Sequence, residues 1–110
     1  MNELAALWLD YAQRNKHGAA VQQANGDVFG AQLCMARADV RTHAAELLVA
    51  SATPAIAAME MHRRATALWQ PNLPLIGYDT AAIAYIQARI WQNCARTIEP
   101  GLPEVQPRLE

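Results

Sequence analysis

The sequence has 110 residues, a hydrophobic fraction of 53% and a formal net charge of −1. This length fits one domain, which we place at residues 1–99, followed by an extended or disordered tail at residues 100–110. The near-neutral charge argues against a nucleic acid as the main partner, because phosphate binding needs Lys and Arg gathered on one face. We find no run of about eighteen uncharged apolar residues to span a membrane and no secretory signal, so we expect a cytoplasmic protein.

The first predicted helix begins near Asn2. Its apolar residues recur at helical spacing on one side, at Leu4, Leu7, Trp8 and Tyr11. Basic residues followed by Gly18 suit a helix C-terminus. A helix that continues to Ala24 is also compatible, at a cost of about 1 kcal/mol for the glycine. In either case the Asn-Gly-Asp sequence at residues 25–27 predicts a break.

The segment at residues 28–50 carries the longest helical pattern, and the rest of the chain is organised around it. Its predicted core stripe is Phe29, Leu33, Ala36, Val40, Ala44 and Leu47. Asp27 is placed to cap this helix. After a short turn, Thr53 caps a third helix and Pro54 takes its first position, where a missing N–H costs nothing. The link is so short that these two helices should run antiparallel.

Residues 70–79 form the one long connection inside the predicted fold, since Pro71 and Pro74 prevent a continuous helix there. Asp79 or Thr80 caps a fourth helix that runs to about Ile98. This helix has two apolar seams, which indicates burial on two sides. The sequence therefore predicts an all-α, antiparallel four-helix bundle-like domain with an apolar, proline-containing loop before the last helix.

Asp39, His43 and Glu46 are spaced four and three residues apart, so their side chains can share one face of the central helix. Two carboxylates and an imidazole are acceptable ligands for a transition metal, which makes these residues weak candidates for a metal site. A solvated polar face explains the same three residues. His62 lies beside two methionines, where core filling is the simpler interpretation.

Other catalytic patterns are incomplete. Arg37 and His43 are separated as in helical ribonuclease domains that use an Arg and a His on one helix, but Ala38 stands where those domains carry a further polar residue. Cys34 and Cys94 have apolar neighbours and no histidine nearby in sequence, so we expect reduced thiols. There is no phosphate loop and no zinc-ligand spacing. We expect no catalytic residue and no cofactor.

The connection before the last helix holds the residues with most functional content: Trp69, Leu73, Leu75, Ile76 and Tyr78. In one interpretation this loop folds over the end of the bundle and closes its core. In the other it stays open as a partner-binding patch, because apolar residues on a proline-stiffened backbone bind at low entropic cost.

Three short motifs, Ala24-Asn25, Gly30-Ala31-Gln32 and Thr53-Pro54, are arranged around a long Ala/Leu helix. This order resembles the phasins, helical proteins that coat polyhydroxyalkanoate granules. The resemblance covers about half of the chain and implies binding to a polyester or lipid-like surface through apolar stripes. The central helix is shorter than in phasins, and the region after residue 68 has no counterpart in their pattern.

Alanine-rich helices bury little area per residue, roughly one methyl group each. The last two predicted helices each carry more than one apolar seam, and a four-helix monomer covers only one. The sequence therefore predicts a non-catalytic interaction or adaptor protein that binds a protein partner or forms a homodimer. A phasin-like protein on a hydrophobic granule and a metal-binding helical bundle are the alternatives.

Overall fold

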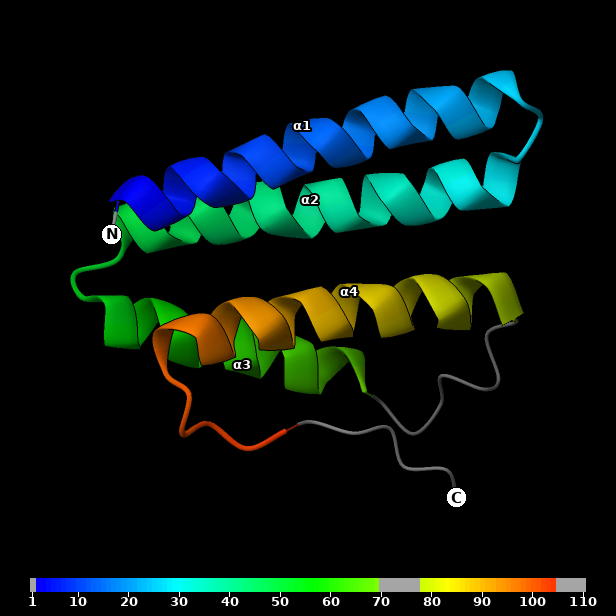
Figure 1. The fold of residues 1–110 in the computed structure, drawn as a ribbon. Coiled ribbons are helices and arrows are strands. Elements are labelled where there is room, and N and C mark those ends of the chain that lie inside the picture. The colour runs from blue at the N-terminus through cyan, green and yellow to red at the C-terminus, as the bar shows by residue number, and fades with distance from the viewer. Residues whose placement is uncertain (1, 70–77, 105–110) are drawn as a thin grey trace.

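The computed structural model describes residues 2–69 and 78–104, and within them the chain is all helical (Figure 1). The four helices of this part are α1 (Asn2–Ala24), α2 (Val28–Ala50), α3 (Pro54–Leu68) and α4 (Tyr78–Ile98). The predicted all-α helical bundle is therefore confirmed. The second and third helices lie where the sequence placed them to within one residue, and α4 begins at Tyr78, slightly before the predicted caps.

Local hydrogen bonds explain where α2 and α3 begin. The Asp27 side chain accepts from the N–H of Gly30 at 2.8 Å, and Thr53 accepts from the N–H of Ile56 at 3.2 Å. Both predicted N-caps are thus confirmed. Of the two predicted ends of α1, the structure shows the later one, at Ala24. The left-handed turn residue is Gly26, with φ at 84°, rather than Gly18.

Small residues form the contact between α1 and α2. Buried alanines recur every seven residues on both helices, at Ala5, Ala12 and Ala19 and at Ala31, Ala38 and Ala45. This spacing keeps them on one face of each helix. Because a methyl group is all that separates the two backbones, the helices can pack closely and antiparallel along their whole length.

The second helix pair, α3 and α4, has the same seven-residue spacing of buried alanines. α3 carries buried Ala58 and Ala65 seven residues apart, and α4 carries Ala88 and Ala95 at the same spacing. The fold is therefore two alanine-seamed helical hairpins, α1–α2 and α3–α4. The hairpins join mainly through α2 and α4, which run in the same direction (Figure 1).

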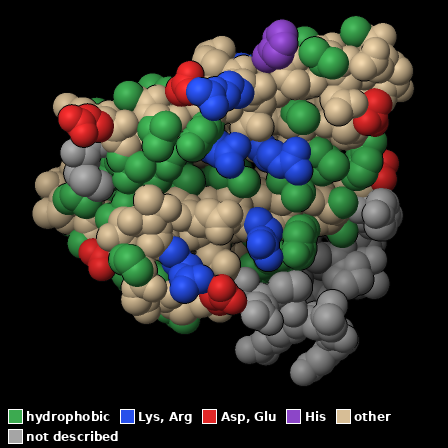
Figure 2. Space-filling view, in the orientation of Figure 1, with side chains coloured by type: hydrophobic (Ala, Val, Ile, Leu, Met, Phe, Trp, Pro, Cys, Tyr) green, Lys and Arg blue, Asp and Glu red, His purple; other side chains and the backbone are tan. Residues whose placement is uncertain are grey.

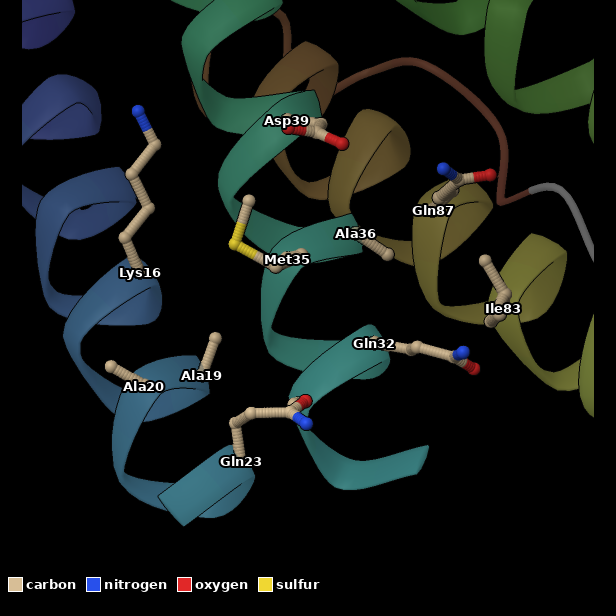
Figure 3. Close-up of a pocket in the computed structure, with 11 residues that line it drawn as sticks. Lys16, Ala19, Ala20, Gln23, Gln32, Met35, Ala36, Asp39, Ile83 and Gln87 are labelled. Carbon is tan, nitrogen blue, oxygen red and sulfur yellow. The ribbon is translucent and has the colours of Figure 1, made fainter. Parts of the chain in front are cut away.

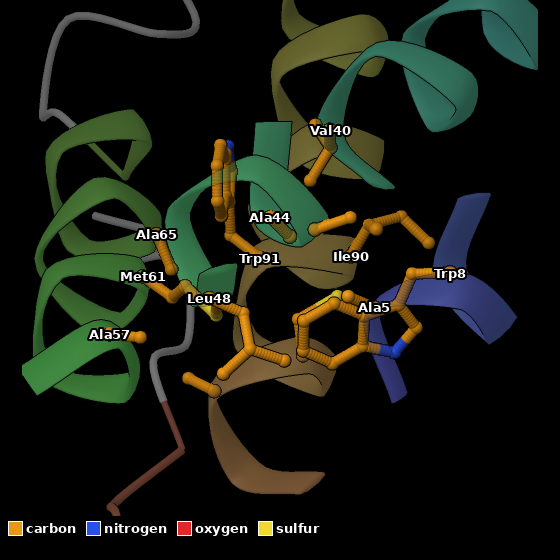
Figure 4. Close-up of a cluster of buried hydrophobic side chains, with 13 residues drawn as sticks. Ala5, Trp8, Val40, Ala44, Leu48, Ala57, Met61, Ala65, Ile90 and Trp91 are labelled. Carbon is orange, nitrogen blue, oxygen red and sulfur yellow. The ribbon is translucent and has the colours of Figure 1, made fainter. Parts of the chain in front are cut away.

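The larger apolar side chains lie where the two hairpins meet (Figure 4). Trp8 from α1, Leu48 from α2, Met61 from α3 and Trp91 from α4 belong to one buried cluster. Met61 is fully buried and is the largest such side chain in the described residues. Each helix thus contributes at least one large residue to a shared core, which supplies the apolar burial that alanine alone cannot.

The molecule is flat, with principal extents of 41, 36 and 18 Å. Within the described residues α1 approaches the backbone of α2 only, while α4 lies against both α2 and α3. α3 has 15 residues and is about 22 Å long, whereas α2 has 23 and reaches about 34 Å. α3 therefore ends well short of the start of α4 and spans only part of the length of α2 and α4 (Figure 1).

The observed core corrects some predicted stripes. On α1, Leu7 and Tyr11 are exposed, because the alanines and Trp8 face α2. On α2 the stripe is shifted, with Phe29, Leu33 and Leu47 only half-buried. The second apolar stripe of α3 is covered only in part: Met59 is 58% exposed, whereas His62 and Trp69 are half-buried. Both seams predicted for α4 contain buried residues, and this helix packs against α2 and α3.

We predict that Ala38→Leu lowers the free energy of unfolding by about 1–3 kcal/mol, because Ala38 is completely buried and the seam has no room for a larger side chain. Urea denaturation followed by circular dichroism measures this change. Ala50→Leu is the matched control, since Ala50 is exposed on the same helix. An Ala38→Leu variant as stable as the wild type would contradict the close α1–α2 contact.

Candidate interaction site

Three adjoining depressions follow α2 along one side of the molecule. The first, about 530 Å³ in volume, lies between α1, α2 and α4, and the second, about 420 Å³, lies between α2, α3 and α4. A third, also about 420 Å³, lies between the end of α2 and α3. Asp39 and Gln87 line both the first and the second, while His43 and Arg64 line both the second and the third.

The first depression, called here the α1–α2–α4 groove, combines an apolar lining with amide groups (Figure 3). Its apolar side chains are Ala19 and Ala20 of α1, Ala31, Met35 and Ala36 of α2, and Ile83 of α4. Its polar side chains are Lys16, Gln23, Gln32, Asp39 and Gln87. Met35 is 40% exposed although it stands among these apolar neighbours. The groove therefore offers uncovered apolar area bordered by hydrogen-bonding groups.

None of the three depressions is lined by all three candidate metal ligands. Asp39 lines the first two, His43 the second and third, and Glu46 only the third. All three are exposed on α2. Among residues 2–69 and 78–104 no three His, Cys, Asp or Glu side chains are grouped closely enough to hold a metal ion.

Two arginines beside the second depression are held by one carboxylate. Arg63 donates to Glu60 from Nε at 2.8 Å and from Nη2 at 2.5 Å, and Arg64 donates from Nε at 3.2 Å. The hydrogen bonds from Arg63, aided by Arg64, lower the pKa of Glu60 to about 2. The Arg64 guanidinium also lies 5.0 Å from the centre of the Trp91 ring. The guanidinium groups of Arg63 and Arg64 are thus already in contact with Glu60 and, for Arg64, with Trp91.

Of the predicted partner-binding loop, the structure describes Trp69 in full. Its ring meets Tyr85 of α4 edge-on, with centroids 5.2 Å apart, and its buried Nε1 has no hydrogen-bond partner in the described residues. Leu73, Leu75 and Ile76 lie outside the described residues, as does the side chain of Tyr78. The partner-binding role predicted for this loop stays a prediction.

A polar contact links α1 and α2 at a separate place. The guanidinium carbons of Arg14 and Arg41 lie 5.7 and 5.4 Å from the ring centre of Tyr11, and Arg41 donates to Asn15 at 2.5 Å. In the view of Figure 2, Lys and Arg side chains are spread among hydrophobic ones and form no continuous patch. Arg41 thus joins α2 to α1, whereas Arg14 contacts residues of its own helix.

Both cysteines are free thiols, as expected. Cys34 is half-buried, and the position of a β-carbon on Gly18 would lie 3.6 Å from its sulfur. Cys94 belongs to the buried cluster between the hairpins. Burial raises the pKa of the Cys94 thiol to about 12, against an opposing effect of the positive charge of Arg41.

Sequence reasoning found Asp39 but missed the other residues of the α1–α2–α4 groove. Gln32 and Met35 are sequence neighbours of Leu33 and Ala36, which belong to the predicted core stripe. The stripe gave no reason to single out Gln32 or Met35 as surface residues. Lys16 was placed at a helix terminus in one of the two interpretations left open, and α1 in fact continues to Ala24.

Comparison with protein families, with curated proteins and with solved structures finds no match to this chain. Within the described residues, none of the helices has the length and hydropathy required to cross a bilayer.

We predict that Glu60→Gln lowers the free energy of unfolding at neutral pH by less than about 1 kcal/mol, because the ion pairs are partly exposed. Folding lowers the pKa of Glu60 from 4.5 to about 2, so its contribution is complete above pH 4.5 and is lost as the pH falls toward 2. Urea denaturation across this range should show the two proteins converging. A difference in stability that persists at the lowest pH would contradict the assignment.

We predict that a thiol reagent modifies Cys34 before Cys94 in the native protein, because the thiolate is the reactive form and Cys94 is buried with a raised pKa. Mass spectrometry after timed reaction with iodoacetamide measures the order. In Cys34→Ala, the remaining thiol should react only after urea is added. Equal reactivity of Cys94 in native and unfolded protein would show that this part of the core is open.

Proposed function

We propose that the protein is a non-catalytic helical interaction module that binds a helical segment in the α1–α2–α4 groove. The observation that carries this proposal is the uncovered apolar lining between three helices, bordered by three glutamine side chains. An amphipathic helix fits such a groove, because its apolar face replaces water on the lining. The glutamine amides can form hydrogen bonds with polar groups at the edges of the bound helix.

Met35 is one of several large apolar side chains on the surface. Ten large hydrophobic side chains are exposed in the described residues, on all four helices: Leu7, Leu9, Tyr11, Val21, Val28, Met35, Val49, Ile56, Met59 and Tyr85. Scattered apolar residues are normal on a protein surface. Met35 differs from the others in that it lies within a concave apolar lining, where a partner can surround it.

Binding to a hydrophobic granule, as the phasin resemblance implies, is the second candidate. The feature that favours it is the flat shape, with one dimension of 18 Å and exposed apolar side chains on every helix. A flat molecule brings many side chains to an extended surface at once. Such adsorption needs the apolar side chains of a whole face, whereas helix binding depends on the groove.

We predict that Met35→Arg abolishes binding of helical partners while leaving the helical content unchanged, because a charge then lies on the apolar lining of the groove. Affinity capture from the native host with tagged wild type and variant, quantified by mass spectrometry, measures the loss. Val49→Arg is the matched control, since Val49 is 64% exposed on the same helix and does not line the groove.

Capture of the same proteins by the wild type and by Met35→Arg would contradict binding in the groove. Flotation of the wild type with polyester particles, retained in both Arg variants, would instead favour the granule proposal. Circular dichroism of each variant establishes that a loss of binding does not reflect unfolding.

A further inference from the structure

Two opposite charges lie on either side of Met35 in the α1–α2–α4 groove. Figure 3 shows Lys16 on α1 and Asp39 on α2 at the same end of the groove, with Met35 between them. Both residues are exposed, and neither forms an ion pair with another residue in the part of the chain that the structure describes. Among the described residues, the groove therefore presents a cation and an anion without ion-pair partners, on either side of an apolar lining.

We infer that the segment bound in this groove is the α1–α2 hairpin of a second copy of the chain, an inference that rests on the proposed function. The argument is charge complementarity. A two-fold axis running along the groove, in the plane of contact, places Lys16 of each copy over Asp39 of the other. The same surface then supplies both halves of the contact and forms two ion pairs per dimer.

Helix directions agree with this arrangement. α1 and α2 are antiparallel, and a rotation about an axis along the groove keeps the direction of every helix. α1 of one copy therefore lies antiparallel on α2 of the other, the same relation that the two helices have within one chain. Met35, between the two charges, lies near the axis and packs against Met35 of the second copy, where a flexible thioether fills an irregular gap well.

The extent of the groove limits the area that the two copies can bury. The groove runs from Lys16 to Gln23 on α1 and from Ala31 to Asp39 on α2, a little over two helical turns on each. A stable interface usually buries about 800 Å² on each partner. Because the contact is short, we expect a weak dimer whose population depends on the protein concentration.

The test uses charge reversal. Lys16→Glu places two Glu–Asp contacts in its homodimer, and Asp39→Lys places two Lys–Lys contacts in its own. Each variant should weaken self-association by about tenfold or more, because two attractive pairs become repulsive.

An equimolar mixture of the two should form heterodimers as tight as the wild-type dimer, since both pairs are then again opposite in charge. The double variant Lys16→Glu/Asp39→Lys should also dimerise. Sedimentation velocity across a micromolar range measures all four.

Glu99→Lys is the control, because it makes the same reversal as Asp39→Lys on an exposed residue beyond the end of α4. Wild-type protein that stays monomeric throughout the range would overturn the inference. So would single variants that dimerise like the wild type, or a mixture that fails to restore the dimer. None of these results touches the proposed function, which depends on the separate loss of captured partners in Met35→Arg.

Discussion

The contact between alanine methyl groups is the constraint on which the rest of this structure depends. Ala5, Ala12 and Ala19 face Ala31, Ala38 and Ala45, so the backbones of α1 and α2 can approach closely along more than 30 Å. Such a seam gains many short-range contacts but removes little apolar area from water. The large side chains must therefore be buried somewhere else or remain exposed.

The fold buries only some of its large apolar side chains. Trp8, Leu48, Met61 and Trp91 are buried where the two hairpins meet, and this cluster joins them into one molecule. The hairpins meet through α2 and α4, rather than closing into a square of four mutually packed helices. A flat molecule results, and α3 spans only part of its length. The α1–α2–α4 groove is lined by residues of the other three helices.

Electrostatics separates structural charges from those available to a partner. Arg63 and Arg64 are engaged by Glu60, while Arg14 and Arg41 lie against Tyr11. These arginines hold helical turns or neighbouring helices in place. Lys16 and Asp39 differ, because they stand at the edges of an apolar groove without an ion-pair partner in the described residues. Charge of both signs on one concave surface suits a self-complementary contact, which is why a second copy is the partner we propose.

Much of the architecture was determined by the sequence itself. Asp27, Thr53 and Pro54 set the starts of α2 and α3 through local capping, and helical periodicity over 20 or more residues predicted an all-α bundle. Local signals of this kind act within one or two turns and can be recognised without knowing the fold.

The end of α1 could not be decided in this way, because packing against α2 outweighs the local preference at Gly18. Three features were decided only in three dimensions: the exposure of Met35, the absence of Glu46 from the depressions that Asp39 lines, and the position of Lys16 and Asp39 on opposite sides of the groove. Each depends on which helix covers which face, and in alanine-rich helices several faces are apolar enough to be buried.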